Sequence, residues 1–234
     1  MVEASFYVFV HSRSSKQRLD EAGFDSKVQL VPFPCEFKAT DPHPQIQAES
    51  NRLHLASLGL VTPTKQIPME IHALATIRES LPPFRYHLVG EVSDRPKLDA
   101  LLRRTGLEEQ VKIWGYVSFE DLNRIAASVD IVVGLRYPSA GETSAALFRA
   151  LAEGKTNVVF DYASYADVPD GVLCKVPLSS DSTRMLAEAL LELGSNPRRR
   201  EEINRRAVAY ASLLHAHTHA ARLMRDSIRE VMDA

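Results

Sequence analysis

The sequence has 234 residues, of which 45% are hydrophobic and 25% charged, the ordinary balance of a globular protein. Its 28 basic and 30 acidic residues give a formal net charge of −2, so no basic excess predicts a nucleic-acid partner. Cys35 and Cys174 lie far apart without CxxC spacing, which excludes a zinc site or a disulfide framework and favours a reducing cytoplasm.

The N-terminal segment predicts a strand, a helix and a second strand, followed by a linker. The apolar run 5–11 is rich in aromatic and β-branched residues, as in a buried strand. Helix formers follow at 14–22, and 27–32 predicts another short strand. Four prolines between 32 and 50 then indicate a linker.

A regular alternation of strands and helices occupies the rest of the chain. Strands are expected at 53–58, 86–89, 111–114, 130–135, 157–160 and 172–176. Helices are expected at 67–80, 96–104, 119–128, 143–153, 182–193, 198–214 and 218–232. This order predicts an α/β fold with a Rossmann-like, doubly wound parallel sheet and additional C-terminal helices.

Functional residues of such a sheet are expected just beyond the carboxyl ends of its strands. Gly59, Gly90 and Gly115 each follow a strand, and the loop 136–144 (RYPSAGETS) follows another. Glycine lets a ligand approach the backbone because no Cβ intervenes. A glycine after a strand is also common turn chemistry, so each position alone is weak evidence.

The loop before the helix at 143–153 is the most informative. Exposed amides at a helix start, together with the helix dipole, favour an anion. Lys65 follows Gly59 by six residues on a neighbouring loop, where its ammonium could bind the same anion. The pattern therefore suggests a diphosphate between Lys65 and the start of this helix. The alternative is that Thr143 or Ser144 only caps the helix and that Lys65 is solvated.

The segment 53–169 resembles the C-terminal domain of glycosyltransferase family 4, which has a GT-B fold. LASLGLVTPTK is similar to the first strand, glycine turn and phosphate-binding lysine of that family. YHLVGEV and VKIWGYVSFEDLNRIAASVDIVV resemble the next strands and the turn that holds the base. LRYPSAGETSAALFRALAEGKTNVVFD resembles the donor-sugar loop and helix, and ASYADVP the acidic turn that follows.

The resemblance implies a division of the chain into three parts. Residues 1–50, with YVFVHSRSSKQRL and VQLVPFP, are similar to the end of the N-terminal acceptor domain and its linker. Residues 51–214 would bind the nucleotide sugar, and 215–234 would form a helix that crosses back. The implied partner is a missing acceptor domain, in cis or in trans, and little transfer is expected from this chain alone.

The resemblance also implies a reaction and a set of site residues. A retaining transferase passes a sugar from a nucleoside diphosphate to an acceptor hydroxyl, here in surface polysaccharide or glycolipid synthesis. Lys65 and Glu142 would act in catalysis without a metal or other cofactor. The residues expected to bind the nucleotide sugar are Gly59, Lys65, Gly90, Tyr116, Val117, Arg136, Glu142, Thr143, Ser144 and Arg149.

Two positions depart from the family pattern. Leu60 replaces an arginine after the first glycine, so Arg136 would supply the lost phosphate contact. Arg149 replaces a second glutamate that binds ribose, and a guanidinium cannot accept hydrogen bonds from hydroxyl groups. A catalytically silent nucleotide-binding or assembly module is therefore the alternative function, and a sugar-nucleotide epimerase of GT-B type is a third.

Several other features have structural explanations that are at least as good. The arginines between 198 and 206 are interrupted by glutamates and predict a solvated helix face. The alternative is a patch that contacts a partner or the inner face of a membrane. His215, His217 and His219 invite a metal site, and His215 and His219 share one helix face. No acidic residue lies between them and no third ligand is evident nearby, which favours an ordinary helix over a metal site. His11, Trp114, Asp167 and Asp170 are structural candidates as much as functional ones.

Overall fold

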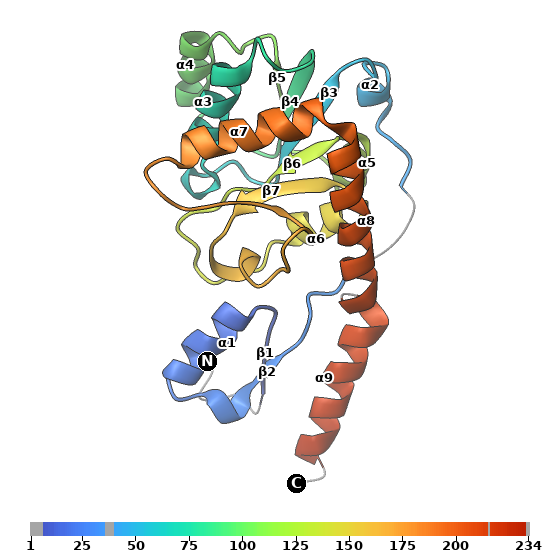
Figure 1. Cartoon of the computed structure of the whole chain (residues 1–234). Helices are drawn as coiled ribbons and strands as arrows, with labels where there is room; N and C mark the ends of the chain where they lie inside the picture. The colour runs from blue at the N-terminus through green and yellow to red at the C-terminus, as the bar shows by residue number, and fades with distance from the viewer. Residues whose placement is uncertain (1–6, 36–39, 215, 233–234) are drawn as a thin grey trace.

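The computed structural model describes residues 7–35, 40–214 and 216–232. Near the N-terminus, β1 (Val8–Val10) and β2 (Val28–Leu30) pair in parallel, connected by α1 (Arg13–Glu21) and the 3-10 helix η2 (Asp25–Lys27). This small unit lies below the main domain in Figure 1. The polypeptide then passes through a short helix, α2 (Pro44–Gln47), within the predicted linker.

The main domain contains a six-stranded parallel sheet in the order β5-β4-β3-β6-β7-β8. Its strands are β3 (Leu53–Leu58), β4 (Phe84–Val89), β5 (Val111–Gly115), β6 (Ile131–Val133), β7 (Thr156–Phe160) and β8 (Cys174–Val176). Every residue of β3 is buried, as expected for a central strand covered on both faces. The strand order reverses direction between β3 and β6, where the loops that follow these strands diverge and leave space for a ligand.

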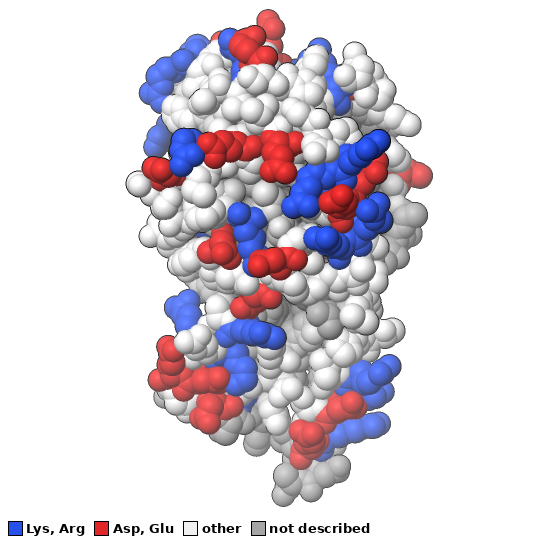
Figure 2. Space-filling view, viewed as in Figure 1, with Lys and Arg blue, Asp and Glu red and all other residues white. Residues whose placement is uncertain are grey.

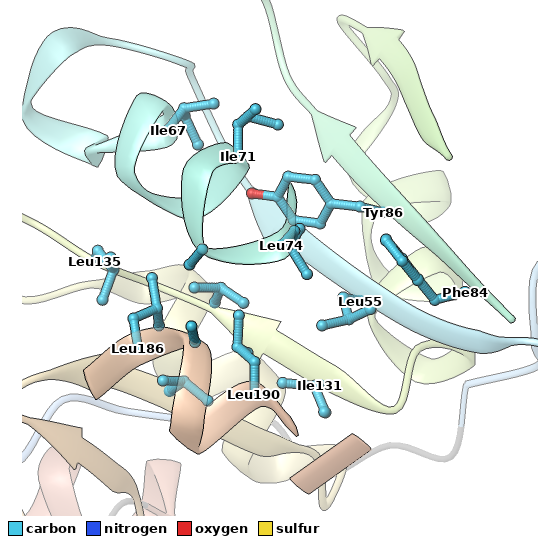
Figure 3. Close-up of a cluster of buried hydrophobic side chains, with 14 of the residues drawn as sticks. Leu55, Ile67, Ile71, Leu74, Phe84, Tyr86, Ile131, Leu135, Leu186 and Leu190 are labelled. Atoms are coloured by element: carbon cyan, nitrogen blue, oxygen red, sulfur yellow. The ribbon is translucent and has the colours of Figure 1, made fainter. Parts of the chain in front are cut away.

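Helices cover both faces of this sheet (Figure 1). They are α3 (Ile67–Ile77), α4 (Arg95–Thr105), α5 (Phe119–Ser128), α6 (Ala145–Ala152), α7 (Ser182–Ser195), α8 (Pro197–Leu214) and α9 (His217–Met232). Leu55, Tyr86 and Ile131 pack with α3, α4 and α7 on one face. Figure 3 shows part of this cluster, with Leu186 and Leu190 of α7 facing the strands. Ala56 and Val132 point to the opposite face, toward α5 and α6.

The alternation of side chains along each strand explains these two layers. Leu55 and Leu53 face α3 and α7, whereas Ala56 and Leu58 face α5. Successive residues of a strand point to opposite faces, and both faces here are apolar. The doubly wound α/β fold predicted from the sequence is therefore confirmed.

Most boundaries lie within a few residues of those predicted, and the differences are local. The helix predicted at 143–153 begins at Ala145, because Ser144 adopts an extended backbone and caps it. The linker contains α2, whose Ile46 is buried against the α5 face. In the described part of the chain, no helix combines the length and apolar character needed to cross a membrane.

Charged side chains of both signs are interspersed over the face shown in Figure 2, including the arginine-rich start of α8. Arg199, for example, pairs with Glu202 at 3.2 Å on the same helix. This mixture fits the solvated helix face expected from the sequence better than a patch of one sign.

Candidate functional site

The turns after β3 and β4 touch through their backbones. Gly59 and Gly90 have φ values of +95° and +139°, which side chains disfavour. A Cβ on Gly90 would lie 2.4 Å from the carbonyl oxygen of Gly59. Gly90 is thus required by the contact between the two turns, which also shapes the rim of the sheet at this point.

Lys65 is buried at this rim, contrary to the solvated alternative. It ends the 3-10 helix η3 (Pro63–Lys65), its exposed fraction is 6%, and its Nζ donates a hydrogen bond to the carbonyl oxygen of Leu58. A Cβ on Gly59 would lie 3.6 Å from Nζ. That distance is an ordinary van der Waals contact, so the positive φ of Gly59, and not a lack of space beside the ammonium, accounts for glycine at this position.

The loop of Lys65 is joined to the loop after β6. The amide of Tyr137 donates to the carbonyl of Thr64 at 2.8 Å, and Nε2 of Gln66 donates to the carbonyl of Tyr137 at 2.7 Å. Lys65, Arg136, Ser144 and other residues line one narrow cavity of about 10 Å³, together with Leu58, Val132, Val133, Gly134, Leu135, Ala146, Leu147, Asn157 and Tyr165. The structure therefore brings Lys65 and the start of α6 to the same cavity.

The start of α6 retains free donors. Oγ of Ser144 accepts a hydrogen bond from the amide of Leu147 at 3.3 Å, so this side chain is the N-cap. The amides of the first helical residues, Ala145 and Ala146, have no partner within a helix. Ala146 lines the cavity of Lys65, whereas Ala145 lines a second cavity on the other side of the helix. The Ser144 side chain can therefore cap α6 while the first amides of the helix remain available to an anion. Thr143 directly precedes the cap.

Arg136 and Glu142 bind each other. Nη1 of Arg136 lies 2.6 Å from Oε1 of Glu142, and Oε2 accepts from the amide of Ala140 at 2.8 Å. Burial alone would raise the pKa of Glu142, but these hydrogen bonds and the arginine charge hold it below its usual value. Nε of Arg136 is buried without a hydrogen-bond partner among the described residues, so the guanidinium keeps an unused donor.

Arg149 lies on the other side of α6, in a second cavity. Its guanidinium carbon is 4.2 Å from the centre of the Phe119 ring. The cavity has a volume of about 260 Å³ and is lined by Phe33, Pro34, Cys35, Thr40, Phe119, Asn123, Ala145, Phe148, Arg149 and Glu153. Burial lowers the pKa of the Arg149 guanidinium, and the charges of Cys35 and Glu153 partly oppose that fall. The two cavities therefore flank the first turn of α6, and each presents a cation.

Tyr116 and Val117 lie on the turn after β5, between this strand and α5. The side chain of Tyr116 is 86% exposed, whereas Val117 packs against the core beneath α5. The turn therefore exposes the Tyr116 side chain to solvent and directs Val117 toward the core.

Glu70 and Tyr86 are buried polar residues of the core that the sequence did not reveal. Oε2 of Glu70 accepts a hydrogen bond from the hydroxyl of Tyr86, and both groups are fully buried. Burial raises the pKa of Glu70 to about 8, and the charge of Lys65 partly opposes that rise. Burial lowers the pKa of Lys65 to about 8, opposed in turn by Glu70. The only sign of this buried pair in the sequence was the carboxyl group of Glu70 at an otherwise apolar position of the helix.

Other candidates have structural partners. His11 lies 2.9 Å from the carbonyl of Val31, and Nε1 of Trp114 donates to His87 at 3.1 Å. Asp167 accepts from the amide at the start of α1, and Asp170 pairs with Lys175. His215 lies outside the described residues, as does the side chain of His217. No cluster able to hold a metal ion occurs among the residues that are described.

The sheet order, the two helix layers and the loops at the strand ends define the C-terminal half of a GT-B fold. The sequence profile described as "Glycosyl transferases group 1" matches residues 52–196, more than half of the chain. The chain belongs to this glycosyltransferase family. No curated protein matches it in sequence.

Several solved structures share the fold. Sucrose-phosphate synthase from Thermosynechococcus elongatus superposes with a TM-score of 0.82 at 19% identity, covering 99% of this chain and 60% of the other. Anabaena HepE in complex with UDP gives a TM-score of 0.78 at 18% identity, covering 98% and 64%. The pneumococcal O-GlcNAc transferase GtfA in complex with UDP and GlcNAc gives 0.79 at 15%, covering 99% and 46%. The chain thus spans less than two thirds of each.

Proposed function

We propose that this chain is the donor-binding domain of a retaining glycosyltransferase and holds a nucleoside-diphosphate sugar at the end of its parallel sheet. The observation that supports this most directly is the shared cavity of Lys65 and the start of α6. One ammonium and a set of free helix amides suit a diphosphate. Two proteins that share the fold, Anabaena HepE and the pneumococcal GtfA, have been solved in complex with UDP.

The proposed roles follow from charge and position. Lys65 and the amides of α6 stabilise the negative charge that develops on the nucleoside-diphosphate leaving group, a task that fixed donors in a buried site perform well. Glu142 accepts hydrogen bonds from hydroxyl groups of the donor sugar once it exchanges partners with Arg136. Arg136 then turns toward a phosphate, in place of the cation that Leu60 does not supply.

The nucleoside would extend from this cavity toward the second one. Backbone groups near Tyr116 and Val117 would contact the base, and Arg149 would lie beside the ribose or the nearer phosphate. Gly59 and Gly90 would let the diphosphate approach the backbone. Thr143 and Ser144 would present the first amides of α6. No metal or other cofactor is part of this proposal.

The whole enzyme would act on sugars, as a hexosyltransferase, in surface polysaccharide or glycolipid synthesis on the cytoplasmic side of a membrane. Residues 1–50 would belong to the end of an acceptor domain and its linker, 51–214 to the donor domain, and 215–234 to a crossing helix. The acceptor half would come from another segment, in cis or in trans, so transfer by these 234 residues alone is expected to be slight.

Calorimetry with UDP and GDP on the wild-type chain and on Lys65→Met tests the proposal. Methionine keeps the length and apolar stem of the lysine but removes the charge. We expect one of the two nucleotides to bind and the variant to weaken its binding by about 10- to 150-fold, the value of a charged hydrogen bond of about 1.5–3 kcal/mol. Failure of the wild-type chain to bind either nucleotide would refute the proposal.

A silent nucleotide-binding or assembly module is the second candidate, and Leu60 and Arg149 are the observations that favour it. Leu60 is 55% exposed and offers no cation at the rim. Arg149 offers no hydrogen-bond acceptor. The two functions separate in a transfer assay with the acceptor half restored: nucleotide binding without transfer of any sugar would support the silent module.

A further inference from the structure

We propose that Ser15 is a positioning residue for the donor sugar, because it holds the loop from which Glu142 reaches that sugar. The inference rests on the proposed function, since Glu142 belongs to the same site. Ser15 itself meets no ligand and acts through the main chain of the loop 139–142, which follows β6. Its effect is therefore on binding of the sugar and not on binding of the nucleotide.

The first step of the argument is a direct hydrogen bond between α1 and this loop. Oγ of Ser15 donates to the carbonyl oxygen of Gly141 at 2.6 Å. The same Oγ accepts a hydrogen bond from Oγ of Ser12 at 2.7 Å, and Ser12 is buried. A hydroxyl group has one proton to donate, so the proton of Ser15 is directed to Gly141.

The second step is that α1 is itself anchored on the main domain. The amide of Arg13, at the start of the helix, donates to Oδ2 of Asp167 at 2.6 Å, and an amide in this position has no partner within a helix. Asp167 lies just after the 3-10 helix η4 (Ala163–Tyr165). In Figure 1 the upper end of α1 points toward the main domain. Ser15 therefore presents its hydroxyl from a helix whose start is fixed.

The third step is the place of the bonded carbonyl within the loop. The carbonyl of Gly141 belongs to the peptide unit that joins Gly141 to Glu142, and a peptide unit is planar. The next peptide unit is held as well, because Oγ of Ser164 in η4 donates to the carbonyl of Glu142 at 3.2 Å. Side chains from two other elements thus fix the main chain on both sides of Glu142.

The loop needs these anchors because of Gly141. Its φ is +97°, and glycine has more conformational freedom than any other residue. The carboxylate of Glu142 contacts Arg136 and the amide of Ala140, and it exchanges Arg136 for the donor sugar when that sugar binds. The hydrogen bond from Ser15 does not depend on this exchange, so it keeps Glu142 within reach of the sugar.

The proposed nucleotide contacts lie elsewhere. Lys65 and the first amides of α6 bind the diphosphate in the proposed function, and Ser144 caps α6 from within its own helix. Within the described part of the chain, the hydroxyl of Ser15 bonds only to Ser12 and Gly141. Loss of this hydroxyl therefore reduces the affinity for a nucleotide sugar and leaves the affinity for the parent nucleotide unchanged.

The test compares the full wild-type chain with Ser15→Ala. Calorimetry measures binding of UDP-glucose, UDP-N-acetylglucosamine and GDP-mannose, each beside UDP or GDP. Nuclear magnetic resonance relaxation without ligand measures the order parameter of the Glu142 amide. Ser164→Ala removes the other anchor and is the second variant, in case Ser15→Ala folds poorly.

Two further variants separate positioning from a merely structural role. Ser14→Ala is the matched control, because the Ser14 hydroxyl lies 3.2 Å from Oγ of Ser12 on the same helix and bonds to no group of the main domain that the structure describes. Ser15→Thr is the conservative variant, because it keeps a hydroxyl group at this position.

We expect Ser15→Ala to raise the Kd for the nucleotide sugar that the wild type binds most tightly by about three- to tenfold, the value of a neutral hydrogen bond, and to change the Kd for its parent nucleotide by less than about twofold. The order parameter of the Glu142 amide should fall from about 0.85 to about 0.6. Ser15→Thr should retain the wild-type values, and Ser14→Ala should change none of them.

An unchanged Kd for the nucleotide sugar would overturn the inference, as would an equal rise for the nucleotide sugar and its parent nucleotide. A wild-type chain that binds none of the three nucleotide sugars would refute the proposed function. In that chain a lower order parameter in Ser15→Ala would still support the positioning of the loop by Ser15, and an unchanged order parameter would overturn it.

Discussion

The histidine pair inside the sheet makes the stability of this domain dependent on pH. Nε1 of Trp114 donates to Nδ1 of His87 at 3.1 Å, so in the neutral ring Nε2 carries the proton. That proton is donated to Nδ1 of His54 at 3.0 Å, and Nε2 of His54 donates to the carbonyl of Glu49 at 3.0 Å. Both nitrogens of each ring are therefore engaged in hydrogen bonds, and His87 has no site left for another proton.

The magnitude follows from the pKa of His87. Burial, with smaller contributions from His54, Lys112 and Arg85, lowers this pKa from 6.5 to about 3. The unfolded chain therefore binds the proton first as the pH falls, so stability is fully present above pH 6.5 and is lost progressively down to about pH 3. Each pH unit in this window costs up to about 1.4 kcal/mol, or about 2 kcal/mol between pH 6.5 and 5.

Urea denaturation of the wild type, His87→Gln and His72→Gln at several pH values measures this effect. His87→Gln removes the titrating group, so the loss of unfolding free energy between pH 6.5 and 5 should shrink by about 2 kcal/mol relative to the wild type. His72 is exposed on α3 and serves as the control, which should retain the wild-type slope. Equal pH slopes in the wild type and His87→Gln would refute this reasoning.

Three further predictions concern the rim of the sheet. Gly90→Ala should destabilise the chain by more than about 2 kcal/mol in urea denaturation, since the new Cβ would meet the Gly59 carbonyl at 2.4 Å; a loss below about 0.5 kcal/mol would show that the turns can separate. Ser144→Ala should cost about 1 kcal/mol by the same measurement through loss of the cap, and stability equal to wild type would mean that this cap contributes nothing. Arg149→Met should weaken UDP binding about tenfold in calorimetry, because the variant loses a hydrogen bond from the guanidinium to a phosphate. Stronger binding by the variant would show that Arg149 contacts no phosphate and only hinders binding of the ribose.

The sequence predicted the framework well because its signals are local. The run at 53–58 is apolar throughout, and the structure places β3 at those same residues. Ser118 caps α5 through the amide of Asp121, and that helix also has the predicted bounds. The start of α6 was misplaced by two residues, because Thr143 and Ser144 are both good caps and only the backbone distinguishes them.

The site was predicted less completely because its partners are distant in sequence. Lys65 and the loop after β6 were placed at one rim from strand order alone, and the structure brings them to one cavity. The pairing of Arg136 with Glu142 and the hydrogen bond between Tyr86 and Glu70 depend on side-chain contacts between distant residues. The sequence shows that Glu70 interrupts an apolar helix face, but not which side chain binds it.

The central claim is that Lys65 and the first amides of α6 hold one diphosphate. A crystal structure of the chain with UDP tests it most directly. We predict the diphosphate within hydrogen-bond distance of Nζ of Lys65 and of the amides that begin α6, with Arg136 turned away from Glu142. A diphosphate bound elsewhere, with both groups left without contact to it, would contradict the claim.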